Sequence, residues 1–172
     1  DITYVEGVKP NAFTSFYALD LDHEQVDVEV VLGDAGYNLY VSENNIYLVG
    51  NIYYFTPLTA FVDTDDQVSE TKTAIMKVAI NGADLEYVTT GVIAGYTLNQ
   101  FSMDEYEGNL RIATTTGNWG NSINNRLFIL DENLEEISKL ENIGKPGELI
   151  RSVRFTGEYG YIVTFEQTDP FY

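Results

Sequence analysis

The stretch LNQFSMDEYEGNLRIATTTG (98–117) decides the fold. Two short runs in which apolar and polar residues alternate flank an acidic turn that contains a glycine. Alternation with a period of two places one face of each run on a core, so this stretch predicts a β-hairpin. Similar hairpins are predicted at YNLYVSENNIYLVG (37–50) and IRSVRFTGEYGYIVTF (150–165). The chain therefore contains a repeated unit.

Aligning the three hairpins predicts which positions are equivalent. Two sets of residues align: Tyr47 with Arg111 and Tyr161, and Val41 with Phe101 and Val153. A second type of hairpin alternates with the first, at 15–36, 74–95 and 126–147, and each copy ends in a glycine. Two hairpins every ~50 residues are typical of the four-stranded blades of a β-propeller.

The sequence thus predicts an all-β fold, a partial β-propeller of about three four-stranded antiparallel blades. The whole chain, 1–172, is expected to be a single propeller fragment. Residues 14–51 supply the outer strands of one blade and the inner strands of the next, 74–117 form the second repeat, and 126–172 form a truncated third repeat. A meander or sandwich of about twelve strands is the alternative. We assign 131–143, which has mixed helical character, to strands.

Charge and composition exclude several function classes. The chain contains nine Lys and Arg residues and 27 Asp and Glu residues, which gives a net charge of −18. Such a chain repels nucleic acid and anionic lipid, so we expect no nucleic-acid partner. No apolar run is long enough to span a bilayer, which predicts no direct membrane insertion. The absence of cysteine excludes disulfides, thiolate catalysis and thiolate zinc sites.

Two segments outside the predicted strands are candidate ligand-binding loops. One is the irregular stretch 51–73, which carries an aromatic cluster, and the other is the Gly- and Asn-rich stretch 114–126. Aromatic rings and amide groups suit the faces and hydroxyls of a sugar or a peptide, although packing between blades is the alternative role for the tryptophan. The candidate residues are Tyr53, Tyr54, Asn118, Trp119 and Asn121.

A weak calcium site is a further hypothesis, and no other cofactor is expected. The acidic run DTDD (63–66) offers oxygen ligands from Asp63, Asp65 and Asp66. The run lacks the glycine and the closing glutamate of an EF-hand, so an ordinary acidic loop is the simpler interpretation.

No catalytic residues are predicted. The only histidine, His23, lies in the turn DLDHEQ, where we expect it to be exposed. Nucleophile elbows and phosphate-binding loops are absent from the sequence. Arg111, Arg151 and Arg154 lie on predicted strands of an acidic chain, and we expect them to form structural pairs rather than bind anions.

The stretches LNQFSMDEYEGNLRIATTTG, LFILDENLEEISKLENI and PGELIRSVRFTGEYGYIVTFEQTDPFY resemble a known family. They are similar to secreted proteins of bacteria and archaea that contain a C-terminal β-propeller domain, and the resemblance runs from about Thr14 onward. It implies a propeller, export to the cell surface or beyond, no established activity, and a chain that is part of a larger ring.

Two functions from different classes remain open. The first is a non-catalytic binding or scaffold module of an exported, cell-surface protein, with a protein or carbohydrate ligand. The second is a calcium-dependent or carbohydrate-active enzyme domain whose site is completed by missing blades. We also expect the fragment to form a homodimer, because half-blades leave open strand edges.

Overall fold

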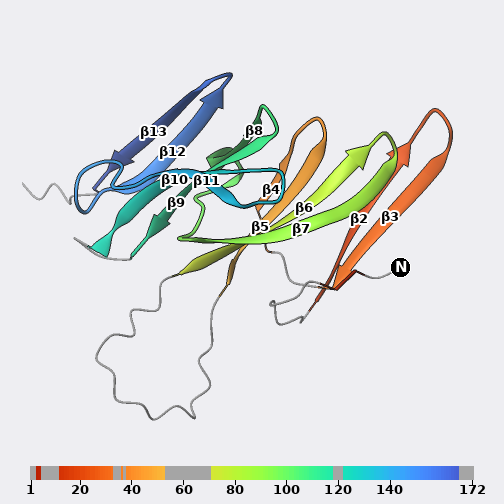
Figure 1. The fold of residues 1–172 in the computed structure, drawn as a ribbon, viewed down its shortest axis with the longest axis horizontal. Coiled ribbons are helices and arrows are strands. Elements are labelled where there is room, and N and C mark those ends of the chain that lie inside the picture. Colours follow the sequence, from red (N-terminus) through yellow and green to blue (C-terminus); the bar gives the residue numbers. More distant parts are fainter. Residues whose placement is uncertain are drawn as a thin grey trace, which may run out of the picture.

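A computed structural model describes residues 3–4, 12–32, 36, 38–52, 71–117 and 122–166. Apart from one 3-10 turn, η1 (Gln100–Ser102), every regular element in these residues is a β-strand. The strands form four sheets that succeed one another along the long axis of the molecule (Figure 1). The all-β prediction is therefore confirmed.

Two complete antiparallel sheets form the middle of the molecule, and each follows the chain order without a crossover. We call them blade B and blade C. Blade B consists of β4 (Asn38–Val41), β5 (Asn45–Ile52), β6 (Lys72–Asn81) and β7 (Asp84–Ala94). Blade C consists of β8 (Met103–Tyr106), β9 (Asn109–Thr116), β10 (Asn124–Leu130) and β11 (Glu136–Leu140). The stretch 131–143 thus holds a turn and the strand β11 rather than a helix.

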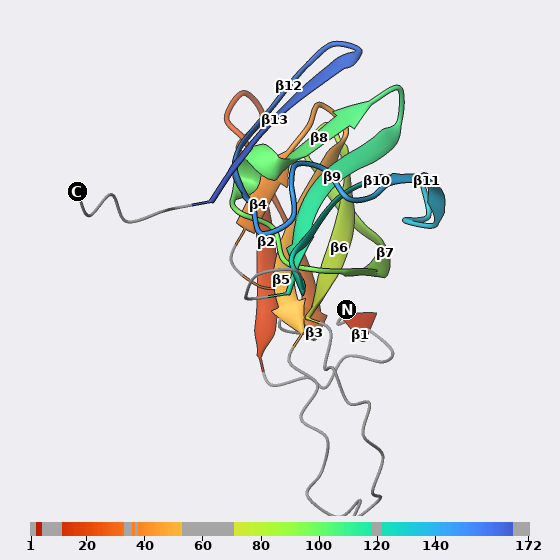
Figure 2. The same ribbon diagram turned by 90° about the vertical axis from the view of Figure 1, so that its left-hand side faces the viewer.

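Smaller sheets flank the two blades, and we call them half-blade A and half-blade D. Half-blade A pairs β2 (Phe13–Asp20) with β3 (Gln25–Leu32), and the short β1 (Thr3–Tyr4) adds to β3 in parallel. Half-blade D is the hairpin of β12 (Leu149–Thr156) and β13 (Tyr159–Phe165). The two half-blades lie at opposite ends of the molecule (Figure 1), and the sheets do not close into a ring (Figure 2). The parallel strand β1 was not predicted.

Strand register tests the predicted equivalences. Tyr47, Arg111 and Tyr161 are each the third residue of the second strand of their sheet, as expected. Their partners on the first strand are Tyr40, Asp104 and Arg154, respectively.

The second predicted alignment, of Val41 with Phe101 and Val153, is wrong. On the first strands, Tyr40, Asp104 and Arg154 are equivalent, so the residues that follow them are equivalent too. They are Val41, Glu105 and Phe155. Phe101 lies in η1, ahead of β8, because the Asn99 side chain accepts a hydrogen bond from the Phe101 amide and caps a 3-10 turn. The alternating pattern conceals this turn.

The core lies between the sheets rather than within one of them. The largest cluster joins Tyr47, Val49 and Ile75 of blade B to Leu110 and Ile112 of blade C, all at most 1% exposed. Burying each such side chain contributes roughly 1.5–3 kcal/mol. Smaller clusters join half-blade A to blade B and blade C to half-blade D. Each sheet therefore depends on its neighbours to bury its apolar faces.

The glycines that end the second type of hairpin share a backbone conformation. Gly36, Gly95 and Gly147 have φ angles of +96°, +93° and +87°. L-residues rarely adopt this region, because their Cβ atom meets backbone atoms. The repeat of glycine in the sequence therefore marks the point where the chain leaves one sheet for the next.

Replacing Gly95 with alanine should destabilise the fold strongly. A Cβ atom there would lie 2.8 Å from both Thr114 Oγ1 and the carbonyl oxygen of Thr115. We expect a loss of about 1–2 kcal/mol from the φ angle and about 1–3 kcal/mol from the collision. Gly108→Ala is the control, because Gly108 also has a positive φ, +78°, but its Cβ would meet nothing within 4 Å. Equal midpoints for both variants in urea denaturation would contradict the collision.

Candidate functional site

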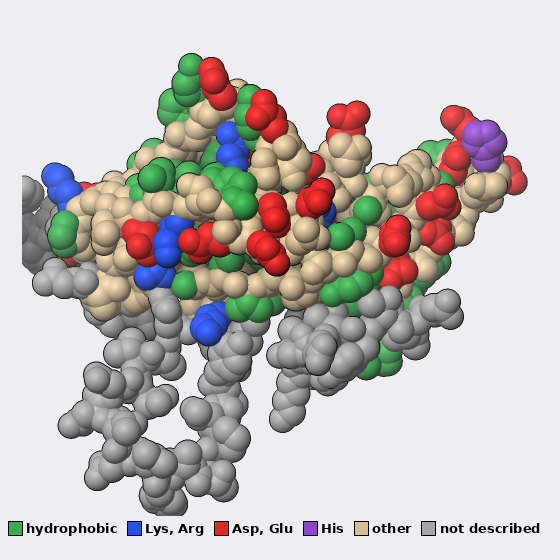
Figure 3. All heavy atoms as spheres, viewed as in Figure 1, with side chains coloured by type: hydrophobic (Ala, Val, Ile, Leu, Met, Phe, Trp, Pro, Cys, Tyr) green, Lys and Arg blue, Asp and Glu red, His purple; other side chains and the backbone are tan. Residues whose placement is uncertain are grey.

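The residues predicted to bind ligands or calcium all fall outside the described residues, so those hypotheses remain predictions. They are Tyr53, Tyr54, Asp63, Asp65, Asp66, Asn118, Trp119 and Asn121. Within the described ranges, no group of three or more His, Cys, Asp or Glu side chains could hold a metal ion. Acidic side chains are spread along the visible face of the molecule rather than gathered at one point (Figure 3).

A cavity of about 390 Å³ lies where the first strands of three successive sheets meet. The first strands of propeller blades surround the central axis, so we call this hollow the axis cavity. Its walls come from β4, η1, β8 and β12. The lining residues are Leu39, Tyr40, Val41, Gln100, Phe101, Met103, Asp104, Arg154 and Phe155.

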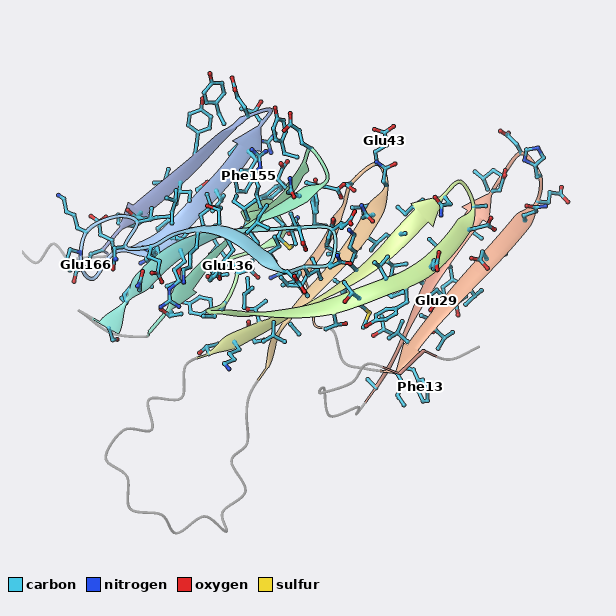
Figure 4. The ribbon with its side chains drawn as sticks, in the orientation of Figure 1. Phe13, Glu29, Glu43, Glu136, Phe155 and Glu166 are labelled. Carbon is cyan, nitrogen blue, oxygen red and sulfur yellow. The ribbon has the colours of Figure 1, made fainter. Side chains whose placement is uncertain are left out.

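Apolar side chains dominate the lining of the axis cavity, and three of them are accessible. Leu39, Val41 and Phe101 are each about half exposed, with Phe101 at 53%. Phe155, on β12, completes the wall (Figure 4). Large accessible apolar groups around a hollow are typical of surfaces that bind a ligand. Sequence analysis did not find this cavity, because its residues come from three different repeats.

Two charged residues in the lining have different surroundings. Asp104 accepts hydrogen bonds from the guanidinium of Arg111, so its charge is compensated. Arg154 makes no hydrogen bond or ion pair with any described residue. Its guanidinium therefore presents five N–H donors to a bound group. The expectation that all three strand arginines are structurally paired is wrong for Arg154.

A half-buried carboxylate, that of Glu105, joins blade B to blade C beside the axis cavity. Glu105 Oε2 accepts hydrogen bonds from Ser42 Oγ at 2.7 Å, Asn45 Nδ2 at 2.9 Å and Tyr47 Oη at 2.9 Å. The Glu105 amide donates to Tyr40 Oη at 2.9 Å. One residue of β8 thus satisfies four polar groups of blade B.

Opposing effects act on the pKa values in this cluster. Burial raises the pKa of Glu105, but the hydrogen bonds from Ser42, Asn45 and Tyr47, together with the nearby Lys77, outweigh it and lower the pKa overall. Burial and the contact with Glu105 raise the pKa of Tyr47, which keeps its hydroxyl protonated and able to donate. The cluster is therefore a charged acceptor with neutral donors.

Arg111 makes the corresponding contact between blade C and half-blade D. Its guanidinium carbon lies 4.7 Å from the ring centre of Tyr106 and 4.8 Å from that of Phe155. Arg111 Nη2 donates to the carbonyl oxygen of Gly157 at 2.8 Å and also to Asp104. Contact with two rings, together with hydrogen bonds from both Nε and Nη2, suits the planar guanidinium of arginine.

Other charged residues singled out by the sequence have local roles. Arg151 stacks on Phe165, with its guanidinium carbon 4.8 Å from the ring centre. His23 lies in the exposed turn between β2 and β3, as expected, and its Nδ1 is 2.8 Å from Asp20 Oδ2 (Figure 3). A smaller hollow between β7 and β10–β11 is lined by six apolar residues and by four charged residues that pair with one another, among them Arg126 with Glu141.

The architecture agrees with the comparison with known families. The model of a family described as a beta propeller domain matches residues 1–172. This chain belongs to that family. The β-propeller domain is also similar to two uncharacterised archaeal proteins. One, from Methanocaldococcus jannaschii, is 43% identical over 100 residues, which are 57% of this chain and 15% of that protein.

The second relative, from Archaeoglobus fulgidus, is 46% identical over 101 residues, which are 59% of this chain and 15% of that protein. The aligned part of this β-propeller thus spans about one seventh of either relative. No solved structure matches the chain. Among the described residues, no helix has the length and apolar character needed to cross a membrane.

Glu105→Gln should weaken the contact between blades B and C. The amide retains an acceptor oxygen but loses the charge, so we expect a loss of about 1–2 kcal/mol in the free energy of unfolding at pH 7. Folding lowers the pKa of Glu105 from its ordinary value of 4.5, so the charged carboxylate stabilises the fold at pH values above 4.5. This contribution is lost as the pH falls through the lowered pKa of the folded state.

Urea denaturation of both proteins at pH 7 and about pH 3 would measure this loss. The difference between wild type and Glu105→Gln should shrink at the lower pH. Glu107→Gln, at the exposed turn after β8, is the control and should behave as wild type at both values. A constant difference across the pH range would contradict the charged role.

Arg111→Lys tests the stacked guanidinium. Lysine keeps the charge but lacks the planar fork that donates to Asp104 and Gly157 while stacking on Phe155. We expect a loss of about 1–3 kcal/mol by thermal or urea denaturation. Arg154→Lys should change stability by less than about 0.5 kcal/mol, because Arg154 is exposed. Equal losses in the two variants would contradict this role.

Proposed function

We propose that this β-propeller is a non-catalytic binding module of an exported, cell-surface protein, and that the axis cavity receives an apolar side chain of a protein ligand. The observation that carries the proposal is a hollow of about 390 Å³ with accessible apolar walls beside an uncompensated guanidinium. Ligand sites commonly combine an apolar hollow with a few polar groups that fix orientation.

The chemistry of the lining favours a protein segment. Leu39, Val41, Phe101, Met103 and Phe155 are five of the nine lining residues, and all five are apolar. An aliphatic or aromatic anchor from a partner is the usual occupant of such a hollow. Arg154 and the amide of Gln100 would bind a backbone carbonyl or a carboxylate next to that anchor.

The other parts of the proposal have different support. Export to the cell surface rests on the resemblance to secreted propeller proteins, and the lack of cysteine is compatible with it. For the alternative, a calcium-dependent or carbohydrate-active enzyme, the described ranges offer no group of three or more His, Cys, Asp or Glu side chains that could hold a metal ion. The candidate ligands Asp63, Asp65 and Asp66 lie outside those ranges.

Selection from a library of displayed peptides, with a glycan array in parallel, would test the proposal. Peptides enriched on the wild-type protein should share an aliphatic or aromatic anchor, and Phe101→Ala should weaken their binding at least tenfold, about 1.4 kcal/mol. Phe13→Ala is the control, because Phe13 is an exposed phenylalanine at the far end of β2 (Figure 4). Enrichment of glycans alone, or equal binding by the Phe101→Ala protein, would overturn the proposal.

A further inference from the structure

The smaller hollow between β7 and β10–β11 has both of its walls in complete blades, and we call it the junction hollow. Its volume of about 310 Å³ is at the lower end of the range for small-molecule sites, roughly 300–1,000 Å³. Blades B and C each have a sheet packed on both faces, so the hollow belongs to the interior of the row of sheets. Its apolar lining residues are Val92, Ile93, Ala94, Phe128, Leu130 and Leu134.

A close contact between the two blades fixes one end of the junction hollow. Leu134, in the turn between β10 and β11, is 6% exposed and has a φ angle of +61°, which a leucine rarely adopts. Its side chain lies against Gly91 of β7, where a Cβ atom would come within 2.7 Å of Leu134 Cβ. Lys77 Nζ donates to the carbonyl oxygen of Glu132 in the same turn at 2.9 Å. The turn is thus held against blade B and forms a fixed wall of the hollow.

A β-bulge in β11 brings two charged side chains to the junction hollow. Phe128 of β10 pairs with Lys139 of β11. Two residues further along β10, Leu130 pairs with Glu136 (Figure 4). Ile137 is the extra residue of the bulge, so Glu136 and Lys139 share one face of the sheet although they are three positions apart. Bulges commonly re-aim side chains next to functional sites.

The charged side chains at the rim of the junction hollow alternate in sign. Arg126 Nε lies 3.0 Å from Glu141 Oε1. Lys139 Nζ lies 3.7 Å from Glu136 Oε1 and 3.6 Å from Glu141 Oε1, distances that are too long for hydrogen bonds. Among the described residues, neither Lys139 Nζ nor the Glu136 carboxylate has a hydrogen-bond partner. An ammonium group and a carboxylate are therefore adjacent and available to a ligand.

We propose that the junction hollow binds a free α-amino acid with an aliphatic side chain. Such a ligand carries an ammonium group and a carboxylate on one carbon atom, so its two charges are close together like those of Glu136 and Lys139. The ligand's carboxylate accepts hydrogen bonds from Lys139, and its ammonium group donates to Glu136. The four charges then alternate in sign, and each of the two protein groups gains the hydrogen bonds that it lacks.

The apolar wall of the junction hollow receives the side chain of the amino acid. Val92 is 46% exposed, whereas Phe128 and Leu130 are 3% and 0% exposed and are held in the core. An aliphatic side chain would cover Val92 and rest on this fixed wall, which removes apolar surface from water. A peptide fits the charges poorly, because its amino and carboxyl termini belong to different residues. The ligand class therefore differs from the protein segment proposed for the axis cavity.

Isothermal titration calorimetry with L-leucine tests the proposal. We expect a dissociation constant of about 1 mM or below. Leucinamide lacks the carboxylate, isocaproate lacks the ammonium group and glycine lacks the side chain, so each should bind at least tenfold more weakly. No binding of L-leucine at ~10 mM, or equal binding of leucinamide or isocaproate, would overturn the proposal.

Glu136→Gln tests the contact with the ligand's ammonium group. The variant should bind L-leucine at least tenfold more weakly, because the amide lacks the charge of the carboxylate. Glu86→Gln is the matched control, since Glu86 is an exposed glutamate on β7 that does not line the hollow. Both variants should unfold at the wild-type concentration of urea. Unchanged binding by Glu136→Gln would overturn the proposal.

NMR of a protein with labelled methyl groups locates the ligand. L-leucine should shift the methyl signals of Val92 and Leu134 and leave those of Leu39 and Val41, in the axis cavity, unchanged. Shifts confined to Leu39 and Val41 would place the amino acid in the axis cavity and overturn this proposal. Phe101→Ala should bind L-leucine as the wild type does, so the two binding proposals fail or stand separately.

Discussion

Face-to-face packing of small sheets is the constraint on which the rest of this structure depends. A four-stranded sheet with two apolar faces cannot shelter either face alone, so stability comes from the clusters between neighbours rather than from any one blade. This explains why the hydrophobic core is divided into three clusters. It also explains why large apolar side chains are exposed at both ends of the row and at the first strand of blade B.

Polar contacts add specificity to this packing beside the axis. The carboxylate of Glu105 and the guanidinium of Arg111 each reach across a junction between sheets and satisfy several groups of the neighbour. Arg111 is buried and Glu105 is half-buried. Away from water, hydrogen bonds to charged groups are strong and an unpaired partner is costly. The axis cavity lies against this polar layer, so its walls rest on groups that are firmly positioned.

Much of the fold is readable from the sequence, because alternation and glycine placement act locally. The hairpins around 98–117 and 150–165 and the glycines at 95 and 147 follow directly from strand period and turn chemistry. The 3-10 turn at Phe101 was not visible, because an Asn cap within an alternating run leaves the pattern intact. The axis cavity could not be predicted, since Leu39, Phe101 and Arg154 meet only through the stacking of three sheets.

The cross-strand pair beside the axis differs from sheet to sheet: Tyr40 with Tyr47, Asp104 with Arg111, and Arg154 with Tyr161. Repeat proteins risk docking the wrong copies together while they fold, because their units have the same shape. Replacing Asp104 with the tyrosine or the arginine of the other pairs would leave the buried guanidinium of Arg111 without its carboxylate. The variation among the repeats thus makes the contact of Arg111 with Phe155 and Gly157 specific to the junction between blade C and half-blade D.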